Sequence, residues 1–253
     1  MVDRISAASQ PLGCKIAVLI PALNEEKSIA HVLRDVPGEI CLSPIVIDNG
    51  STDCTAEIAL RSGARVVLER QRGYGAACLA GIRALPSDTE IVVFLDADYS
   101  DFPAEMRKLV RPIAEGRADL VLGTRMHDRE TRGALTPQQR WGNWLATRLM
   151  QCLWLVAYTD LGPFRAIRRT SLDALEMTDR NFGWTVEMQI KAASSGLRIL
   201  EIPVQYRARM GRSKISGTVK GTLLAGMKIL YTIFRYAWIT RRRSLERRAV
   251  EGS

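Results

Sequence analysis

The sequence predicts an α/β domain built on a mixed, mostly parallel sheet flanked by helices. Three apolar runs, residues 15–20, 45–47 and 91–95, have the length of buried strands, and each is followed by polar and acidic residues. Helix-start and turn signals follow the strands, which is typical of βα units. At 253 residues and 47% hydrophobic content, the chain can bury a large core as a single domain.

The segments after the first two runs contain turn and capping residues. Pro21 ends the first strand, and Asn24 can cap the helix that follows it. Gly50 permits a tight turn after the second strand. A helix is expected over residues 55–62, and Gly63 closes it.

Two carboxylates follow the third run, because Asp96 and Asp98 are separated only by Ala97. The carboxyl ends of parallel strands share one edge of the sheet, where such sheets bind ligands. Two carboxylates on a rigid strand end can share a divalent cation that also binds a diphosphate. Such a pair also occurs by chance at solvated strand ends, but helix capping explains acids at all three strand ends poorly. A nucleotide-linked substrate, with Mg²⁺ or Mn²⁺ as cofactor, is therefore expected.

The net charge of +9 indicates an anionic partner. The sequence contains no nucleic-acid recognition module, so phosphate and anionic lipid are the expected partners and nucleic acid is not. The five cysteines are scattered and lack metal-binding spacing, which favours reduced thiols. Residues 1–13 are polar, unlike a signal peptide. These features favour a cytoplasmic protein, peripheral on the inner face of the membrane.

The predicted domain organisation has three parts: a tail (1–13), a catalytic domain (14–218), and an amphipathic helix with a basic tail (219–253). Lys228 and Arg235 would lie near the middle of a membrane-crossing helix, at a cost of about several kcal/mol. The helix is therefore expected to lie on the membrane or against the domain, and core packing is the alternative.

A second amphipathic stretch, residues 141–156, is rich in tryptophan. Tryptophan suits the boundary between lipid headgroups and acyl chains, so this stretch is a second candidate for membrane contact. Ordinary helix packing is the alternative. One expected face contains Trp141, Trp144, Leu145, Leu149, Cys152 and Val156.

A series of motifs resembles the catalytic domain of glycosyltransferase family 2, which has the GT-A fold. Within that family the chain is most similar to the dolichyl-phosphate mannose synthase and polyprenyl-phosphate glycosyltransferase branch. The resemblance covers roughly residues 15–220. It is carried, in order, by residues 20–26, 48–53, 72–77, 96–103, 123–125, 159–166, 184–187 and 211–214.

The resemblance implies roles for residues of the donor half. Asp98 is the first choice as metal ligand, with Asp96 as its partner and Ser100 as a further polar contact. The nucleoside-binding loop is matched by Pro21, Leu23 and Glu25, the base-recognition carboxylate by Asp48, and the donor-binding positions also by Ala97, Gly73 and Gly75. The two glycines are expected to permit close approach of the substrate.

Residues of the second half are expected to distinguish two kinds of acceptor. A lipid phosphate is anionic at neutral pH and needs no base, so Arg125, Arg165 and the cations near Arg209 would hold it. A hydroxyl acceptor needs a base, for which Glu187 is the candidate. The late phosphate-contacting pair is matched by Lys214 with Arg209 or Arg207. Residues 161–165 read Leu-Gly-Pro-Phe-Arg where many relatives carry Ser-Gly-Phe-Arg, a departure within the acceptor half.

The sequence thus predicts an inverting, metal-dependent glycosyltransferase. It would move a hexose from a UDP- or GDP-sugar to a polyprenyl (dolichyl-type) phosphate at the cytoplasmic membrane face. Transfer to a soluble or lipid hydroxyl and a nucleotide-sugar-binding protein without turnover are the alternatives, and retention of both Asp96 and Asp98 is against the latter. Pocket shape decides which sugar and which base are bound, and no motif specifies it.

Overall fold

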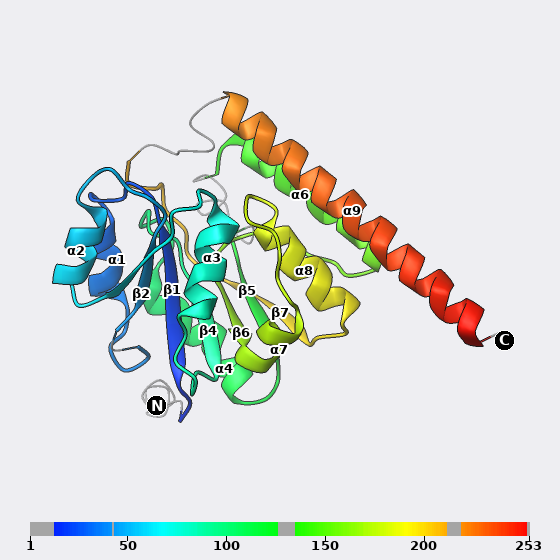
Figure 1. The fold of residues 1–253 in the computed structure, drawn as a ribbon, viewed down its shortest axis with the longest axis horizontal. Coiled ribbons are helices and arrows are strands. Elements are labelled where there is room, and N and C mark those ends of the chain that lie inside the picture. Colours follow the sequence, from blue (N-terminus) through cyan, green and yellow to red (C-terminus); the bar gives the residue numbers. More distant parts are fainter. Residues whose placement is uncertain (1–12, 42, 126–134, 212–218, 252–253) are drawn as a thin grey trace, which may run out of the picture.

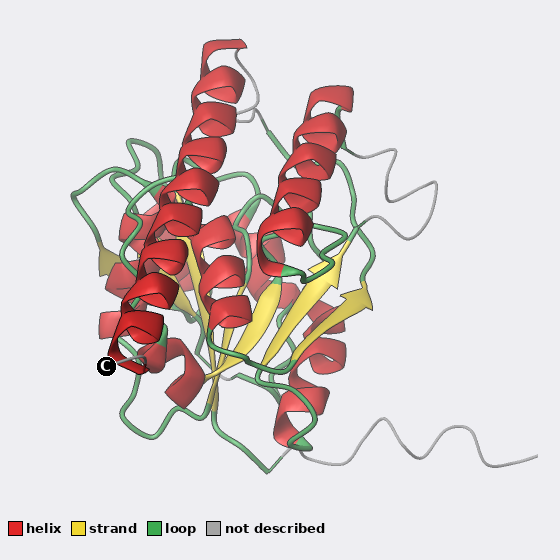
Figure 2. Cartoon of the chain, turned by 90° about the vertical axis from the view of Figure 1, so that its right-hand side faces the viewer, coloured by secondary structure: helices red, strands yellow, loops and turns green. Residues whose placement is uncertain are grey.

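The computed structural model describes residues 13–41, 43–125, 135–211 and 219–251. Its strands form one sheet of order β3-β2-β1-β4-β6-β5-β7, and helices cover both faces (Figures 1 and 2). The strands are β1 (Ile16–Ala22), β2 (Ile45–Asp48), β3 (Arg65–Leu68), β4 (Ile91–Phe94), β5 (Leu120–Thr124), β6 (Arg165–Arg168) and β7 (Ile199–Pro203). The helices are α1 (Ile29–Asp35), α2 (Thr55–Arg61), α3 (Tyr74–Arg83), α4 (Met106–Ala114), α6 (Pro137–Trp154), α7 (Arg169–Ala174), α8 (Trp184–Ser194) and α9 (Val219–Glu251).

The first half of the sheet is parallel. β1 pairs with β2 and β4, and β2 pairs with β3. The register places Ala22 at the end of β1 beside Asp48 at the end of β2. The predicted convergence of the strand ends at one edge of the sheet is confirmed.

The second half makes the sheet mixed. β6 runs antiparallel between β4 and β5, and β7 is parallel to β5. The predicted mixed, mostly parallel sheet is therefore confirmed. The antiparallel strand pairs Arg165 with Phe94, two residues before Asp96.

The strands β1, β2, β4 and β5 are buried on both faces, as their apolar sequences require. Successive residues of β1 alternate between two cores: Val18 and Ile20 pack with α1, α2 and α4, while Leu19 packs on the other face. That second face is covered by α3, α7 and α8, with α6 and α9 outside them (Figures 1 and 2).

The local predictions for the first connections were partly right. Helix α2 begins and ends as expected, and Gly63 follows it with a φ of 85°. Asn24, however, does not cap α1, which begins at Ile29 after Ser28. Its carboxamide oxygen instead accepts from the backbone N–H of Thr52 at 2.8 Å, which joins the loop after β1 to the loop after β2.

Helices α6 and α9 lie side by side (Figure 2). Each buries one face and exposes large apolar side chains on the other. Within α9, Thr232, Ile233 and Tyr236 are buried, whereas Phe234 and Trp238 are more than half exposed. Among the described residues, no helix has both the length and the apolar content that a membrane crossing requires. The domain boundary predicted at 218 falls in residues 212–218, outside the described residues, and stays a prediction.

Candidate active site

A pocket of about 320 Å³ lies at the carboxyl edge of β1 and β4. It brings together most of the predicted donor-binding residues. The predicted residues in its lining are Pro21, Leu23, Glu25, Gly73, Asp96, Ala97, Asp98 and Arg209. The pocket therefore joins segments that are separated by up to about 190 residues in the sequence.

The two aspartates after β4 differ in their surroundings. The Asp98 side chain is buried, and its Oδ1 accepts from the backbone N–H of Ser100 at 2.9 Å and from the Ser100 hydroxyl at 2.5 Å. Asp96 Oδ1 accepts from the Tyr74 hydroxyl at 3.2 Å. Ser100 is fully buried and does not line the pocket, so it orients Asp98 from behind; its expected role as a direct metal contact is not supported.

Arg209 supplies positive charge at the rim of this pair. Its Nη1 lies 3.4 Å from Asp98 Oδ2, and its Nη2 donates to Glu25 Oε1 at 3.0 Å. The backbone N–H of Met210 also donates to the carbonyl oxygen of Asp98 at 2.9 Å. The late basic segment therefore reaches the first strand ends, as the predicted phosphate contact requires.

Arg207 has a different role from Arg209. Its guanidinium lies 3.4 Å from the ring centroid of Tyr99 and 4.1 Å from that of Phe102. It also donates to the carbonyl oxygens of Tyr99 and Asp101. Arg207 thus fixes the loop that follows the aspartate pair and is not in the lining of the pocket.

Negative charge is crowded at this strand end. Burial, and after it the charge of Asp98, raise the pKa of Asp96 to about 7. The carboxylate of Asp101 is buried without a hydrogen-bond partner among the described residues, and burial followed by the charges of Asp96 and Asp98 raises its pKa well above the ordinary value. A cation between Asp96 and Asp98 would relieve this repulsion.

The donor set fits a hard divalent cation that shares its ligands with a substrate. The described residues contain no cluster of three or more His, Cys, Asp or Glu side chains suited to a metal. Mg²⁺ commonly takes one or two carboxylates and completes its coordination with waters and phosphate oxygens. Asp96 and Asp98 in an open pocket match that pattern.

The two glycines of residues 72–77 allow another segment of the backbone, at residues 179 and 180, to approach closely. A Cβ on Gly73 would lie 2.1 Å from the carbonyl oxygen of Arg180, and one on Gly75 would lie 2.1 Å from that of Asp179. Gly73 also lines the pocket, but Gly75 does not. The expected role of Gly75 in admitting substrate is therefore corrected: it admits the backbone before α8.

The base-recognition carboxylate is not in the pocket lining. Asp48 is buried, and its Oδ1 accepts from the backbone N–H of Ser51 at 3.1 Å. The adjacent Asn49 lines the pocket and binds the glycine segment, because its Oδ1 accepts from Gly73 N–H at 2.8 Å and its Nδ2 donates to Gln71 at 2.7 Å. A role of Asp48 in base recognition stays a prediction.

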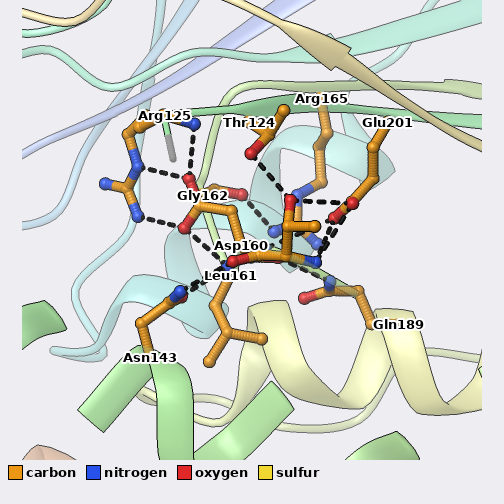
Figure 3. A network of polar contacts seen from close by, with 10 residues as sticks. Thr124, Arg125, Asn143, Asp160, Leu161, Gly162, Arg165, Gln189 and Glu201 are labelled. Carbon is orange, nitrogen blue, oxygen red and sulfur yellow. Dashed lines mark hydrogen bonds and ion pairs between the residues drawn. The ribbon is translucent and has the colours of Figure 1, made fainter. Parts of the chain in front are cut away.

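Arg125 and Arg165 both form hydrogen bonds with other groups of the protein (Figure 3). Arg125 donates from Nε and Nη2 to the two oxygens of Asp160, both at 2.8 Å. Arg165 is buried and donates to the carbonyl oxygens of Thr185 and Gly162. Neither arginine lines the pocket. Their expected contact with an acceptor phosphate is therefore not supported, because these contacts stabilise the second half of the domain.

Glu187 does not lie in the pocket lining and is fully buried. Its oxygens accept from Thr178 Oγ1 at 2.7 Å, the Asp179 N–H at 2.7 Å, the Tyr236 hydroxyl at 2.5 Å and Lys191 Nζ at 2.9 Å. Burial acts to raise its pKa, but these bonds lower the pKa below its ordinary value. The prediction of Glu187 as base is thus corrected, since the carboxylate is occupied by structural contacts.

Several pocket residues were not predicted. Asn181 and Phe182 come from the connection between α7 and α8, and Arg72, Tyr74 and Asn49 lie within the matched motifs. The motif segments were a usable signal for the last three. Nothing in the local sequence indicates that residues 181 and 182 reach the pocket. Lys214 falls in residues 212–218, outside the described residues, so its phosphate role stays a prediction.

Residues 17–176 match the family model described as "Glycosyl transferase family 2". An uncharacterized glycosyltransferase of Mycobacterium tuberculosis is 38% identical over 215 residues, covering 84% of this chain and 95% of the relative. A dolichyl-phosphate hexose transferase of Haloferax volcanii is 34% identical, covering 83% and 90%. An undecaprenyl-phosphate mannosyltransferase of Micrococcus luteus is 31% identical, covering 82% and 90%.

Among solved structures, the chain is similar to glucosyl-3-phosphoglycerate synthase from Mycobacterium tuberculosis. The TM-score is 0.72 at 26% sequence identity, covering 88% of this chain and 80% of the neighbour. That enzyme was crystallised with Mn²⁺, UDP and glucosyl-3-phosphoglycerate.

The variant Glu187→Gln tests the structural role of the buried carboxylate. The amide replaces one acceptor oxygen by a donor facing other donors, so the free energy of unfolding should fall by about 2 kcal/mol at neutral pH. Because the folded pKa of Glu187 is lowered, its stabilisation is full above the ordinary value of 4.5 and is lost as pH falls through the folded pKa. Urea unfolding of both proteins between pH 3 and 7 should show the difference shrink in acid; a pH-independent difference would contradict it.

Proposed function

The chain belongs to glycosyl transferase family 2 and is a glycosyltransferase, and we propose that it moves a hexose from a UDP- or GDP-sugar to a polyprenyl phosphate. The reaction is inverting, depends on Mg²⁺ or Mn²⁺, and takes place at the cytoplasmic face of a membrane. The observation that carries the donor half is the pocket containing Asp96, Asp98 and Arg209. The structural neighbour with UDP and Mn²⁺ supports the same assignment.

The site residues suit a reaction in which a diphosphate departs. A divalent ion at Asp96 and Asp98 would offset the negative charge that the leaving group gains. Arg209 adds a fixed positive charge to the same end of the pocket, where Glu25 orients it. Ser100 donates a hydrogen bond that orients Asp98. Arg207 binds the Tyr99 carbonyl and so fixes the loop that follows Asp98. These residues would therefore bind and orient the donor.

The acceptor is proposed from the relatives and from the chemistry of the site. Two relatives with high coverage are named for transfer to dolichyl or undecaprenyl phosphate. A phosphate nucleophile is already anionic and needs no base. The hydroxyl alternative is supported by the structural neighbour, whose product is glucosyl-3-phosphoglycerate. Glu187, which the sequence suggested as the base for a hydroxyl acceptor, instead accepts a hydrogen bond from the protein backbone.

The exposed faces of α6 and α9 suit an anionic lipid surface. Trp141 and Trp144 of α6 and Trp238 of α9 are more than half exposed. The sequence of α6 contains no acidic residue, and that of α9 contains none before Glu246. Exposed aromatic side chains among basic ones are typical of a helix that lies at the headgroup boundary. The exposed basic residues of these helices include Arg140, Arg148, Arg235, Arg241 and Arg242.

The variant Asp98→Ala tests the metal site. Sugar transfer should fall by about 100-fold or more, because the leaving diphosphate loses its stabilising charge. EDTA should abolish transfer by the wild type, and Mn²⁺ or Mg²⁺ should restore it. Asp88→Ala removes a carboxylate from an exposed ion pair with Lys15 and should leave transfer unchanged. Full chelator-resistant activity, with folding confirmed by circular dichroism, would contradict the metal assignment.

A panel of donors and acceptors tests the acceptor. Radiolabelled UDP- and GDP-sugars are offered with a polyprenyl phosphate in detergent and, separately, with 3-phosphoglycerate. Label should enter the organic phase in the first case and stay at background in the second, because Arg209 gives the pocket a cationic rim for phosphate, whereas the carboxylate suggested as a base, Glu187, is buried outside the pocket lining. Label appearing only in the phosphorylated hydroxyl compound would establish the alternative acceptor.

Vesicle flotation tests the membrane surface. Binding to vesicles containing phosphatidylglycerol should weaken as salt rises, since each basic residue near an anionic surface contributes about 1 kcal/mol. The double variant Trp144→Ser, Trp238→Ser should float less than the wild type. Leu60→Ser removes an apolar side chain that is 59% exposed on α2 and serves as the matched control. Equal flotation of all three proteins would contradict this surface.

A further inference from the structure

One wall of the pocket depends on a loop that has no catalytic motif. Asn181 and Phe182 line the pocket and belong to residues 178–183, which we call the wall loop. It connects the segment after α7 to the first turn of α8. Its position therefore helps to determine the shape of the pocket.

Two buried carboxylates hold the wall loop. Glu187 of α8 accepts from the backbone N–H groups of Thr178 at 3.1 Å and Asp179 at 2.7 Å. Asp179 accepts from the N–H groups of Asn181 at 2.7 Å and Gly183 at 3.2 Å. The backbone that carries the pocket residue Asn181 is thus fixed by side chains behind the pocket.

Both carboxylates are in turn held by α9. The Tyr236 hydroxyl donates to Glu187 at 2.5 Å, and Lys228 Nζ lies 2.8 Å from Asp179 Oδ2. Between them, Thr232 packs against the loop so tightly that a Cβ on Gly183 would lie 2.5 Å from its hydroxyl. These three α9 residues lie one turn apart and share the buried face of the helix.

The other side of the wall loop presses on the glycine segment. The Arg180 carbonyl accepts from Ala76 N–H at 2.9 Å, beside the close approaches to Gly73 and Gly75. The loop is therefore confined between the donor pocket and α9. A shift of α9 cannot be absorbed there without moving pocket residues, because tightly packed interfaces deform little.

We propose that Tyr236 and Lys228 of α9 are positioning residues for the donor pocket, acting through Glu187 and Asp179 on the wall loop. This inference rests on the proposed function, since it takes the pocket to be the nucleotide site. It assigns to α9 a second role besides surface contact, and to Glu187 a role in donor binding without contact to the reacting atoms. By linkage, nucleotide binding and the packing of α9 stabilise each other.

Nucleotide binding by the variant Tyr236→Phe tests the proposal. Titration calorimetry with UDP and with GDP in the presence of Mn²⁺ identifies the tighter ligand, which then serves as the probe. Its Kd should rise about five-fold or more in the variant. Tyr158→Phe is the matched control, because Tyr158 is also buried but donates its hydroxyl to the Gln189 carbonyl of α8 at 2.9 Å, and not to Glu187 or Asp179. Its Kd should equal that of the wild type.

A second variant and a second readout complete the test. Lys228→Met removes the ion pair from a partly exposed side chain, so it provides the measurement if Tyr236→Phe fails to fold. In hydrogen exchange, adding the probe nucleotide should slow the amides of α9 around residues 228–236 in the wild type. The effect should be smaller in either α9 variant. Purely structural contacts would lower the melting temperature of the variants without changing this response.

Two outcomes separate this inference from the function on which it rests. If the wild type binds neither UDP nor GDP, the donor assignment fails and the inference fails with it. If the wild type binds one of them, and Tyr236→Phe and Lys228→Met bind it with unchanged Kd, the inference alone is overturned. Unchanged exchange of the α9 amides on nucleotide addition would also overturn it.

Discussion

The crowding of negative charge at the end of β4 is the constraint on which the rest of the site depends. An apolar, buried strand ends directly in Asp96 and Asp98, so both carboxylates are held rigidly, and burial followed by the charge of Asp98 raises the pKa of Asp96. Fixed hydrogen-bond donors and cations, including the Ser100 hydroxyl and the Arg209 guanidinium, partly offset this negative charge at Asp98. Repulsion that remains between the aspartates is the physical reason why the site suits a divalent ion and a diphosphate together.

The same constraint explains why distant segments converge here. Arg209 follows β7, yet it reaches Glu25 in the loop after β1 and Asp98 after β4. Arg207 clamps the backbone of Tyr99 and Asp101, and in doing so it fixes the direction of the chain after the aspartate pair. The basic segment after β7 therefore has two roles: Arg207 fixes the loop after Asp98, and Arg209 offsets negative charge in the pocket.

The second half of the domain is organised around a different use of charge. Arg125 with Asp160, and Glu187 with Tyr236 and Lys191, are buried groups whose partners are other protein groups. Removing one partner of such a pair leaves an uncompensated buried charge and destabilises the fold, so these contacts have a structural role. Because these groups do not line the pocket, the proposed acceptor phosphate would bind at the rim near Arg209.

Local sequence patterns specified the sheet, the strand ends and the donor motifs. Apolar runs that stop at acids, such as residues 91–95 before Asp96, specify buried strands and a ligand edge through local periodicity alone. Most of the donor-binding residues named from the motifs do line one pocket. The sequence also indicated that residues 219–253 are amphipathic, which agrees with the buried and exposed faces of α9.

Contacts between distant segments determine which polar side chains line the pocket and which bind other groups of the protein. Glu187, Arg165 and Gly75 belong to recognisable motifs, but their neighbours are supplied by α9, the backbone before β6 and the wall loop. The Glu187–Tyr236 contact and the close approach of Gly75 to Asp179 join residues about 50 and 100 positions apart, so no local pattern predicts them. Phe182 enters the pocket for the same reason. The Glu187 carboxylate accepts hydrogen bonds from a backbone N–H and a tyrosine hydroxyl, so it is not available as a base. The sequence shows that a carboxylate is present at this position but does not show which groups bind it.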